Sequence, residues 1–249
     1  MRIRYLSDLH TEFYDLLALN RLLMRIKPSK DEVCVCAGDI GSIVHSRKNY
    51  DITLSYLSKQ FKQVFVINGN HEYYNGDNKT IEQVNAMMKT YFEEKSFTNV
   101  QWLNNTTYKY EDVTFIGTTL WSHVNPNTPE INDTQYIPGL TRDIYNNNHQ
   151  VCREWLRSLV PLPSKSVIIT HHMPSPQLVA PKYKDSAINP WFHCNMEKFI
   201  ENNKKNIACW IYGHTHTASE QHISGVPMLC NPHGYPGENK YIETKIDIY

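Results

Sequence analysis

The first 70 residues alternate between short apolar stretches and segments of helical periodicity. Apolar stretches at 2–7, 32–37 and 63–67 have the length of strands, and apolar residues at helical spacing fill 15–26 and 50–59. This alternation predicts βαβ units and a largely parallel sheet. Each predicted strand ends at a polar motif: Asp8-Leu9-His10, Gly38-Asp39 and Gly69-Asn70-His71-Glu72. Open α/β sheets bind ligands beyond the carboxyl ends of their strands, so the motifs are candidates for one site.

The rest of the chain adds hairpins and further buried strands. The expected elements are, in chain order, a helix at 80–91, a hairpin of 106–110 and 113–117, a helix at 147–159, strands at 166–170 and 208–212, a hairpin of 220–223 and 227–230, and a closing strand at 241–247. Residues 122–141 show no period and hold several Pro, Asn and Asp, which predicts a long surface loop of a functional kind. Two mixed sheets between helices fit this order.

Two more polar motifs follow the later strands, Thr170-His171-His172 and Gly213-His214-Thr215-His216. Together the five motifs supply seven candidate metal ligands: Asp8, His10, Asp39, Asn70, His171, His214 and His216. Imidazole combined with carboxylate or amide oxygen, and no thiolate, suits Mn, Fe or Zn rather than a structural zinc–thiolate centre. Seven ligands are too many for one catalytic ion and about right for two ions that share a carboxylate.

Two divalent ions about 3.5–4 Å apart can hold the attacking and leaving oxygens of a displacement at phosphorus. The ligand set therefore predicts a phosphoester hydrolase in which a hydroxide between the metals attacks. Asp39 is the expected bridge, because a carboxylate has two oxygens and a full charge. His71 should point away from its neighbour Asn70, and a protonated imidazole can donate to a leaving alkoxide near pH 7. We predict His71 as the proton donor; the alternative is a residue that only orients other groups.

The five motifs, in this order, resemble the calcineurin-like metallophosphoesterase family, whose pattern is D-x-H, G-D, G-N-H-E/D, a later H and G-H-x-H. The resemblance implies an α/β fold, a four-layer α-β-β-α sandwich of two mixed sheets. At 249 residues the chain suits a single domain over 1–249. The family resemblance also implies two divalent metal ions as cofactors, with Mn expected ahead of Fe, Zn or Ni.

The resemblance also divides the ligands between the two ions. Asp8, His10, Asp39 and His216 would hold one metal. Asp39, as the bridge, would hold the other together with Asn70, His171 and His214. His71 would sit beside the metals and face the substrate.

The subfamily follows from what the motifs lack. Protein serine/threonine phosphatases of this superfamily carry an Asp and a phosphate-binding Arg shortly after the G-D motif, and neither follows Gly38-Asp39 here. Lariat-debranching enzymes have Cys where this chain has Asp8. The pattern that remains resembles the bacterial and phage-type phosphodiesterases, including cyclic-nucleotide phosphodiesterases. The alternatives are a nuclease, a phosphomonoesterase, and a scaffold without catalysis, which the complete ligand set disfavours.

Four residues outside the ligand set are candidates for substrate contact. Tyr73 and Tyr74 could stack on a base or aryl group, or pack their own loop. Arg142 could clamp a phosphate, although a plain salt bridge is its expected role. His172 should face away from His171 but could touch the substrate. The turn at 231–235 is expected to be structural.

Composition gives expectations about binding partners and cellular location. The 25 basic and 25 acidic residues balance, so no electrostatic footprint for nucleic acid is visible, and nucleic acid enters only as a candidate substrate. Cys34 and Cys36 share a face of an apolar strand and should be small buried hydrophobes, and the six cysteines show no C-x-x-C spacing. No apolar run approaches the roughly 20 residues of a membrane span, and no signal peptide is recognisable. We expect a cytoplasmic enzyme acting on a small phosphoester; the sequence leaves its oligomeric state open.

Overall fold

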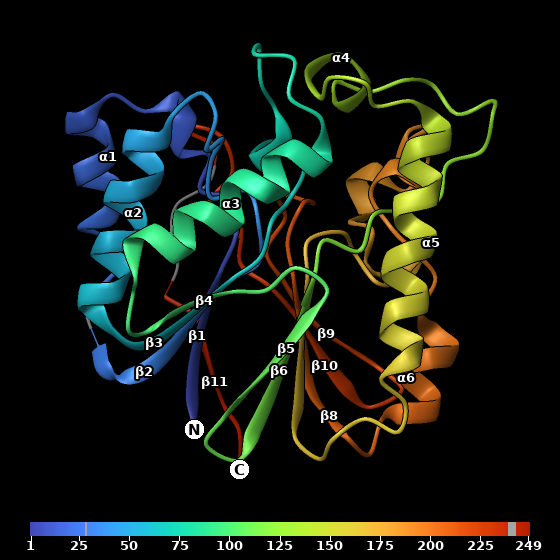
Figure 1. Cartoon of the computed structure of the whole chain (residues 1–249). Coiled ribbons are helices and arrows are strands. Elements are labelled where there is room, and N and C mark those ends of the chain that lie inside the picture. The colour runs from blue at the N-terminus through green and yellow to red at the C-terminus, as the bar shows by residue number, and fades with distance from the viewer. Residues whose placement is uncertain (28, 239–242) are drawn as a thin grey trace.

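The computed structural model describes residues 1–27, 29–238 and 243–249, and it contains two mixed β-sheets between helices (Figure 1). The first sheet has the strand order β11-β1-β2-β3-β4. Its strands are β1 (Arg2–Leu6), β2 (Ser29–Cys36), β3 (Phe61–Val66), β4 (Val100–Trp102) and β11 (Lys245–Asp247). β1 to β4 run parallel, and β11 pairs antiparallel with β1.

The second sheet has the order β5-β6-β7-β8-β10-β9. Its strands are β5 (Thr106–Tyr110), β6 (Val113–Thr118), β7 (Ser166–Thr170), β8 (Ile207–Tyr212), β9 (Ser219–Ile223) and β10 (Val226–Cys230). β6, β7, β8 and β10 run parallel, while β5 and β9 are antiparallel edge strands supplied by the two expected hairpins.

Helices cover the outer face of each sheet. In Figure 1 α1, α2 and α3 lie over the first sheet, and α5 and α6 lie over the second. Their bounds are α1 (Leu16–Leu23), α2 (Arg47–Gln60), α3 (Ile81–Lys95), α5 (Arg142–Ser158) and α6 (Glu197–Asn203), with a short α4 (Asp133–Tyr136). Five 3₁₀ helices also occur in the loops: Thr11–Phe13, His71–Tyr73, Pro176–Leu178, Pro181–Tyr183 and Asn189–Trp191.

The two sheets pack face to face through an apolar layer. Phe65 of β3 and Phe115 of β6 stack across it, with ring centroids 3.9 Å apart and planes at 17°. The alternate residues of the same strands face the helices and join a second, larger core, as Val64 and Ile116 do. Each central strand is therefore buried on both faces, as its continuous apolar sequence requires. The four-layer α-β-β-α architecture is confirmed.

Local capping explains where the helices differ from expectation. α5 begins at Arg142 rather than 147, because the Thr141 side chain accepts the backbone N–H of Ile144 and caps the helix there. α3 begins after a capping box in which Thr80 and Gln83 satisfy each other's backbone N–H groups. α6 was not expected, and the loop at 122–141 contains α4.

Three further sequence expectations concern the closing strand, the cysteines and membrane-spanning helices. Of the expected closing strand at 241–247, residues 245–247 form β11, residues 243–244 precede it outside the strand, and residues 241–242 lie outside the described part of the chain. All six cysteines are buried and unpaired, Cys34 and Cys36 included. None of the helices in the described part of the chain has the length and apolar character needed to cross a membrane.

Candidate metal centre

All five motifs lie at one edge of the molecule, where strands of both sheets end. Asp8 and His10 follow β1, Asp39 follows β2, and the later motifs follow β3, β7 and β8. Backbone hydrogen bonds join the loops: the Asp8 N–H donates to the Gly38 carbonyl at 3.0 Å, and the His10 N–H donates to the Asp39 carbonyl at 3.0 Å. The Gly213 N–H donates to the His171 carbonyl at 3.0 Å and ties the second sheet's motifs together.

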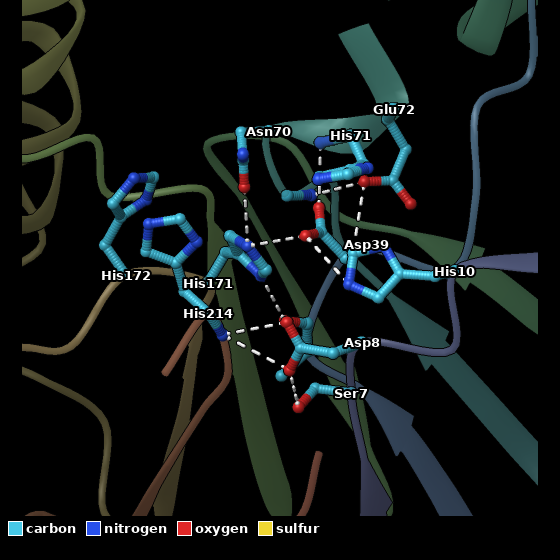
Figure 2. A network of polar contacts seen from close by, with 12 residues as sticks. Ser7, Asp8, His10, Asp39, Asn70, His71, Glu72, His171, His172 and His214 are labelled. Atoms are coloured by element: carbon cyan, nitrogen blue, oxygen red, sulfur yellow. Dashed lines mark hydrogen bonds and ion pairs between the residues drawn. The ribbon is translucent and has the colours of Figure 1, made fainter. Parts of the chain in front are cut away.

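The structure brings the seven candidate ligands into one cluster around Asp39. Figure 2 labels all of them except His216. Three groups have ligand atoms that all lie within 4.8 Å of one another: Asp8, His10 and His216; His10, Asp39 and His71; and Asp39, His171 and His214. The Asp39 Oδ2 lies 3.3 Å from the His171 Nε2 and 3.8 Å from the His10 Nε2, so it faces ligands of both predicted metal sites.

Three of the imidazoles are held by their Nδ1 atoms. The Nδ1 of His171 lies 2.9 Å from the Ala37 carbonyl, that of His216 lies 2.8 Å from Glu238, and that of His10 lies 3.4 Å from Glu12. An oxygen partner at Nδ1 favours the tautomer that is protonated at Nδ1 and carries its lone pair on Nε2. The same contact also orients the ring. The Nε2 atoms of His10 and His216 meet at 2.9 Å.

The polar atoms of the site fit a bound cation. The Nε2 of His214 is buried and has no hydrogen-bond partner. The Asn70 amide donates its Nδ2 to Asp133 at 2.8 Å, which leaves its oxygen directed inward, 3.0 Å from the His171 Nε2. Carboxylate, amide oxygen and imidazole nitrogen converge without thiolate, the donor set of Mn, Fe or Zn.

The charges of the site also favour cations. Burial alone would raise the pKa of Asp39, but the nearby His171 and His71 hold it well below its usual range. Burial lowers the pKa of His171, yet the Asp39 carboxylate outweighs it and raises that pKa to about 10. Likewise the Asp8 carboxylate, against the effect of burial, raises the pKa of His216 to about 9. The buried carboxylates of Asp39 and Asp8 are therefore stabilised by nearby positive charge, which protonated imidazoles or metal ions can provide.

The backbone of the motifs is bent into an unusual conformation. Five of the seven candidate ligands have a positive φ: Asp8, His10, Asp39, His214 and His216. Such a conformation costs a non-glycine residue on the order of 1–3 kcal/mol and persists where the surroundings enforce it. Gly69 permits the close approach, since a Cβ there would collide with Asp39 and His171. The sharp turns direct the side chains of both sheets toward one point.

Glu72, the last residue of the third motif, supports the turn after β2. Its carboxylate accepts the backbone N–H groups of Asp39 at 3.0 Å, Ile40 at 2.8 Å and Gly69 at 2.6 Å. Burial and the Asp39 charge raise its pKa to about 8. Glu72 therefore fixes the loops that carry Asp39 and Asn70.

His71 lies beside Asp39 and lines the cavity. Its backbone N–H donates to the Asp39 Oδ1 at 2.8 Å, and its ring Nδ1 lies 2.8 Å from the Glu12 carboxylate. The ring stacks on Tyr74, with centroids 4.0 Å apart. Burial lowers the pKa of His71, but Asp39 and Glu12 together raise it above the ordinary value, which favours the protonated ring. Its Nε2 points into the cavity, 3.3 Å from the Tyr235 hydroxyl.

A cavity of about 480 Å³ opens onto the cluster. Asp39, Asn70, His71, His214 and His216 form its polar floor. This volume lies within the range of small-molecule sites.

Tyr73 does not contact this cavity, which corrects the expectation for it. Its side chain is 1% exposed, and its hydroxyl is bonded to Asn68 and Asn85 at 2.9 Å. The 3₁₀ turn at His71–Tyr73 rotates it into the core and presents Tyr74 to the cavity instead.

Arg142 and His172 are also placed away from the cavity. Arg142 bonds to the carbonyls of Asn125 and Thr128 and to the Glu130 carboxylate, so it stabilises the 122–141 loop. His172 is fully buried, with its Nε2 3.0 Å from the Tyr145 hydroxyl. Burial and the neighbouring His171 lower its pKa to about 3, and it packs behind His214 as a neutral ring (Figure 2).

Sequence reasoning missed several residues of the site. They are Glu12, Glu72, Asp133, Tyr235 and Glu238, which all contact candidate ligands or His71. Glu12 lies two residues after the first motif and Glu72 is the last residue of the third, so their positions were a usable signal. The turn at 231–235 was expected to be structural, yet it delivers Tyr235 to the cavity wall.

Comparisons with known proteins concern the family and the fold of the chain. The family model described as calcineurin-like phosphoesterase matches residues 1–218. The chain is 30% identical to an uncharacterized protein of Acanthamoeba polyphaga mimivirus, across 99% of this chain and 98% of the viral protein. The fold is similar to that of phosphopantetheinyl hydrolase from Mycobacterium tuberculosis, with a TM-score of 0.70 and 19% identity over 95% of this chain and 90% of that one. At 19% identity, the similarity to the hydrolase structure concerns the fold alone.

Proposed function

The chain belongs to the calcineurin-like phosphoesterase family and is a phosphoester hydrolase, and from that premise we propose that it hydrolyses small phosphodiesters with two divalent cations. Cyclic nucleotides are one such class of substrate. In this proposal Asp8, His10 and His216 hold one cation, and Asn70, His171 and His214 hold the other, while Asp39 contacts both. Manganese suits this donor set, and Fe, Zn and Ni are its competitors.

Two cations in these positions would supply a water acidic enough to attack phosphorus near neutral pH and would stabilise the charge of the transition state. The residues of the chain provide the geometry. Ala37, Glu238 and Glu12 orient the imidazoles, and Glu72 holds the turn that carries Asp39. Each group is positioned before the substrate arrives, which lowers the cost of reaching the transition state.

His71 is the proposed proton donor. Asp39 and Glu12 favour its protonated form, and its Nε2 faces the cavity beside Tyr235. In the reaction a water oxygen that has released one proton to solvent forms the new bond to phosphorus, and the bond from phosphorus to the leaving oxygen breaks. The leaving alkoxide takes the proton from His71, which regains one from solvent, and the second ester group stays on the phosphate product.

The charge of the cavity is the observation that favours diesters. Carboxylates line it at Asp39, Glu130, Asp133 and Glu238, and no Lys or Arg lines it within residues 1–27, 29–238 and 243–249. A diester brings one negative charge, which two cations can neutralise. A dianionic monoester or a nucleic-acid strand brings further charge that would face these carboxylates without a Lys or Arg partner in the lining.

A substrate panel tests the proposal. Protein reconstituted with Mn is given nitrophenyl methyl phosphate, nitrophenyl phosphate, cyclic nucleotides, a phosphoserine peptide and a short oligonucleotide. We expect the highest kcat/KM among the small diesters. A higher kcat/KM for the phosphopeptide or the oligonucleotide than for every small diester would reverse the substrate class. No turnover of any compound with both cations bound would indicate a scaffold.

A further inference from the structure

Beyond His214 the cavity continues along a wall of apolar side chains. We call this wall the apolar arm; its residues are Ile131, Val179, Tyr183, Ile188 and Phe192. The ring of Phe192 stacks on the ring of His214, with centroids 4.5 Å apart and planes at 25°. The apolar arm therefore begins in contact with the candidate metal centre.

The two loops that form the apolar arm are fastened to each other. The Trp191 indole N–H donates to the Pro129 carbonyl at 2.7 Å, which joins the segment 173–193 to the loop 122–141. The Tyr145 hydroxyl of α5 donates to the Trp191 carbonyl at 3.0 Å, and the backbone of Met173 pairs with His193. The arm is thus formed before any ligand binds.

The apolar arm leaves hydrophobic surface open to water. Ile131, Val179, Ile188 and Phe192 are only partly buried, although each packs against the larger core. Tyr183 is 41% exposed. Apolar surface inside a cavity is typical of a site that binds an apolar ligand group.

No Lys or Arg of the described residues lines the cavity, so the apolar arm offers no lining cation to a charged group. Arg142 is bonded to Glu130, and Lys182 lies over the Tyr183 ring at 4.6 Å without lining the cavity. Glu130 and Glu238 line the cavity as carboxylates. A second phosphate or carboxylate on the substrate would meet like charge.

The position of His71 decides which part of the substrate enters the apolar arm. Figure 2 shows His71 and His214 on different sides of Asp39. The leaving oxygen must lie near His71 to receive its proton, so the retained ester group extends toward His214 and Phe192. The retained group, rather than the leaving group, would lie along the apolar arm.

We infer that the enzyme selects phosphodiesters whose retained ester group is uncharged, largely apolar and several carbons long. This inference rests on the proposed function, since it names the substrate class of the same site. It goes beyond it because the metal centre alone would treat a methyl and a hexyl ester alike.

A series of nitrophenyl alkyl phosphates measures the effect, because the leaving group and the reaction stay the same. From methyl to hexyl, kcat/KM should rise about fourfold for each methylene that the arm buries. A terminal carboxylate on the hexyl chain should lower kcat/KM by at least about tenfold. Calorimetry with non-hydrolysable methyl alkylphosphonates should show the same trend in Kd.

Variants assign the effect to the apolar arm. Ile188→Ala, with Val179→Ala as a second variant, should reduce the ratio of hexyl to methyl kcat/KM by about five- to tenfold. Ile144→Ala removes an exposed isoleucine of α5 that does not line the cavity, and it should leave that ratio unchanged. Turnover of the methyl ester with no dependence on chain length would overturn this inference and keep the proposed function. Absence of turnover throughout the series would count against the proposed function itself.

Discussion

The candidate metal centre has two halves that are built differently. The inner half consists of Asn70, His171 and His214, and the outer half of Asp8, His10 and His216; Asp39 lies between them. In the inner half, the backbone carbonyl of Ala37, directly after β2, holds His171, whose side chain is 0% exposed. In the outer half, the carboxylates Glu12 and Glu238 hold the imidazoles, and the His216 side chain is 13% exposed.

This difference separates two ways of positioning a ligand. The Ala37 backbone is bonded to Leu6 of β1, so its carbonyl cannot move without disturbing the fold, and His171 is held rigidly. In the outer half the imidazoles depend on the side chains of Glu12 and Glu238, and His216 is partly exposed. We therefore expect the outer cation to exchange with solvent before the inner one, and to respond to substitutions that leave the fold intact.

The largest effect is expected from Asp39→Ala, which removes the group shared by both halves. Without its charge two cations would repel each other unscreened, so both should be lost, and kcat/KM should fall by at least about 10³-fold. Elemental analysis under metal excess measures the cation content. Retention of one cation at full affinity would show that the halves bind independently.

His71→Ala should keep both cations and slow the chemical step. General acid catalysis contributes about 10²- to 10⁴-fold, and the loss should be smallest for nitrophenyl esters, whose leaving group needs no proton. The measurement compares kcat for nitrophenyl and alkyl esters at equal metal content. Equal losses for the two leaving groups would make His71 an orienting residue, and loss of a cation would make it a ligand of the outer half.

Glu238→Ala should affect the outer half alone. Loss of a carboxylate that orients a ligand imidazole typically weakens metal binding by about 10- to 100-fold. Calorimetric titration with Mn should then show one weakened site and one unchanged site. Glu201→Ala, which removes an exposed carboxylate paired with Lys204, is the matched control and should leave both sites unchanged. Equal weakening of the two sites would contradict the division into halves.

The smallest effect is expected from Tyr235→Phe. Its hydroxyl lies 3.3 Å from the His71 Nε2, and loss of one hydrogen bond corresponds to about a 2- to 10-fold fall in kcat. Metal content should not change, because Tyr235 contacts His71 through its hydroxyl and the outer half only through its ring. A loss as large as that of His71→Ala would give Tyr235 a direct part in the proton transfer.

The order of elements and the edge that carries the site could be predicted because both depend on local pattern. Apolar stretches of strand length become buried strands, and parallel topology brings their carboxyl ends together. All seven candidate ligands therefore meet around Asp39, as their positions after strands required. Helix boundaries were less predictable, since caps such as Thr141 depend on a single side chain.

What supports and surrounds the ligands was decided only by the tertiary structure. Glu238 reaches His216 across 22 residues, and Glu12 reaches His71 across 59. Tyr73 and Tyr74 are neighbours in sequence, yet one is in the core and the other lines the cavity, because a 3₁₀ turn rotates them differently. The apolar arm joins two loops that have no periodicity. Local sequence determines which segments become strands and which polar residues follow them, whereas contacts between loops depend on how the two sheets pack.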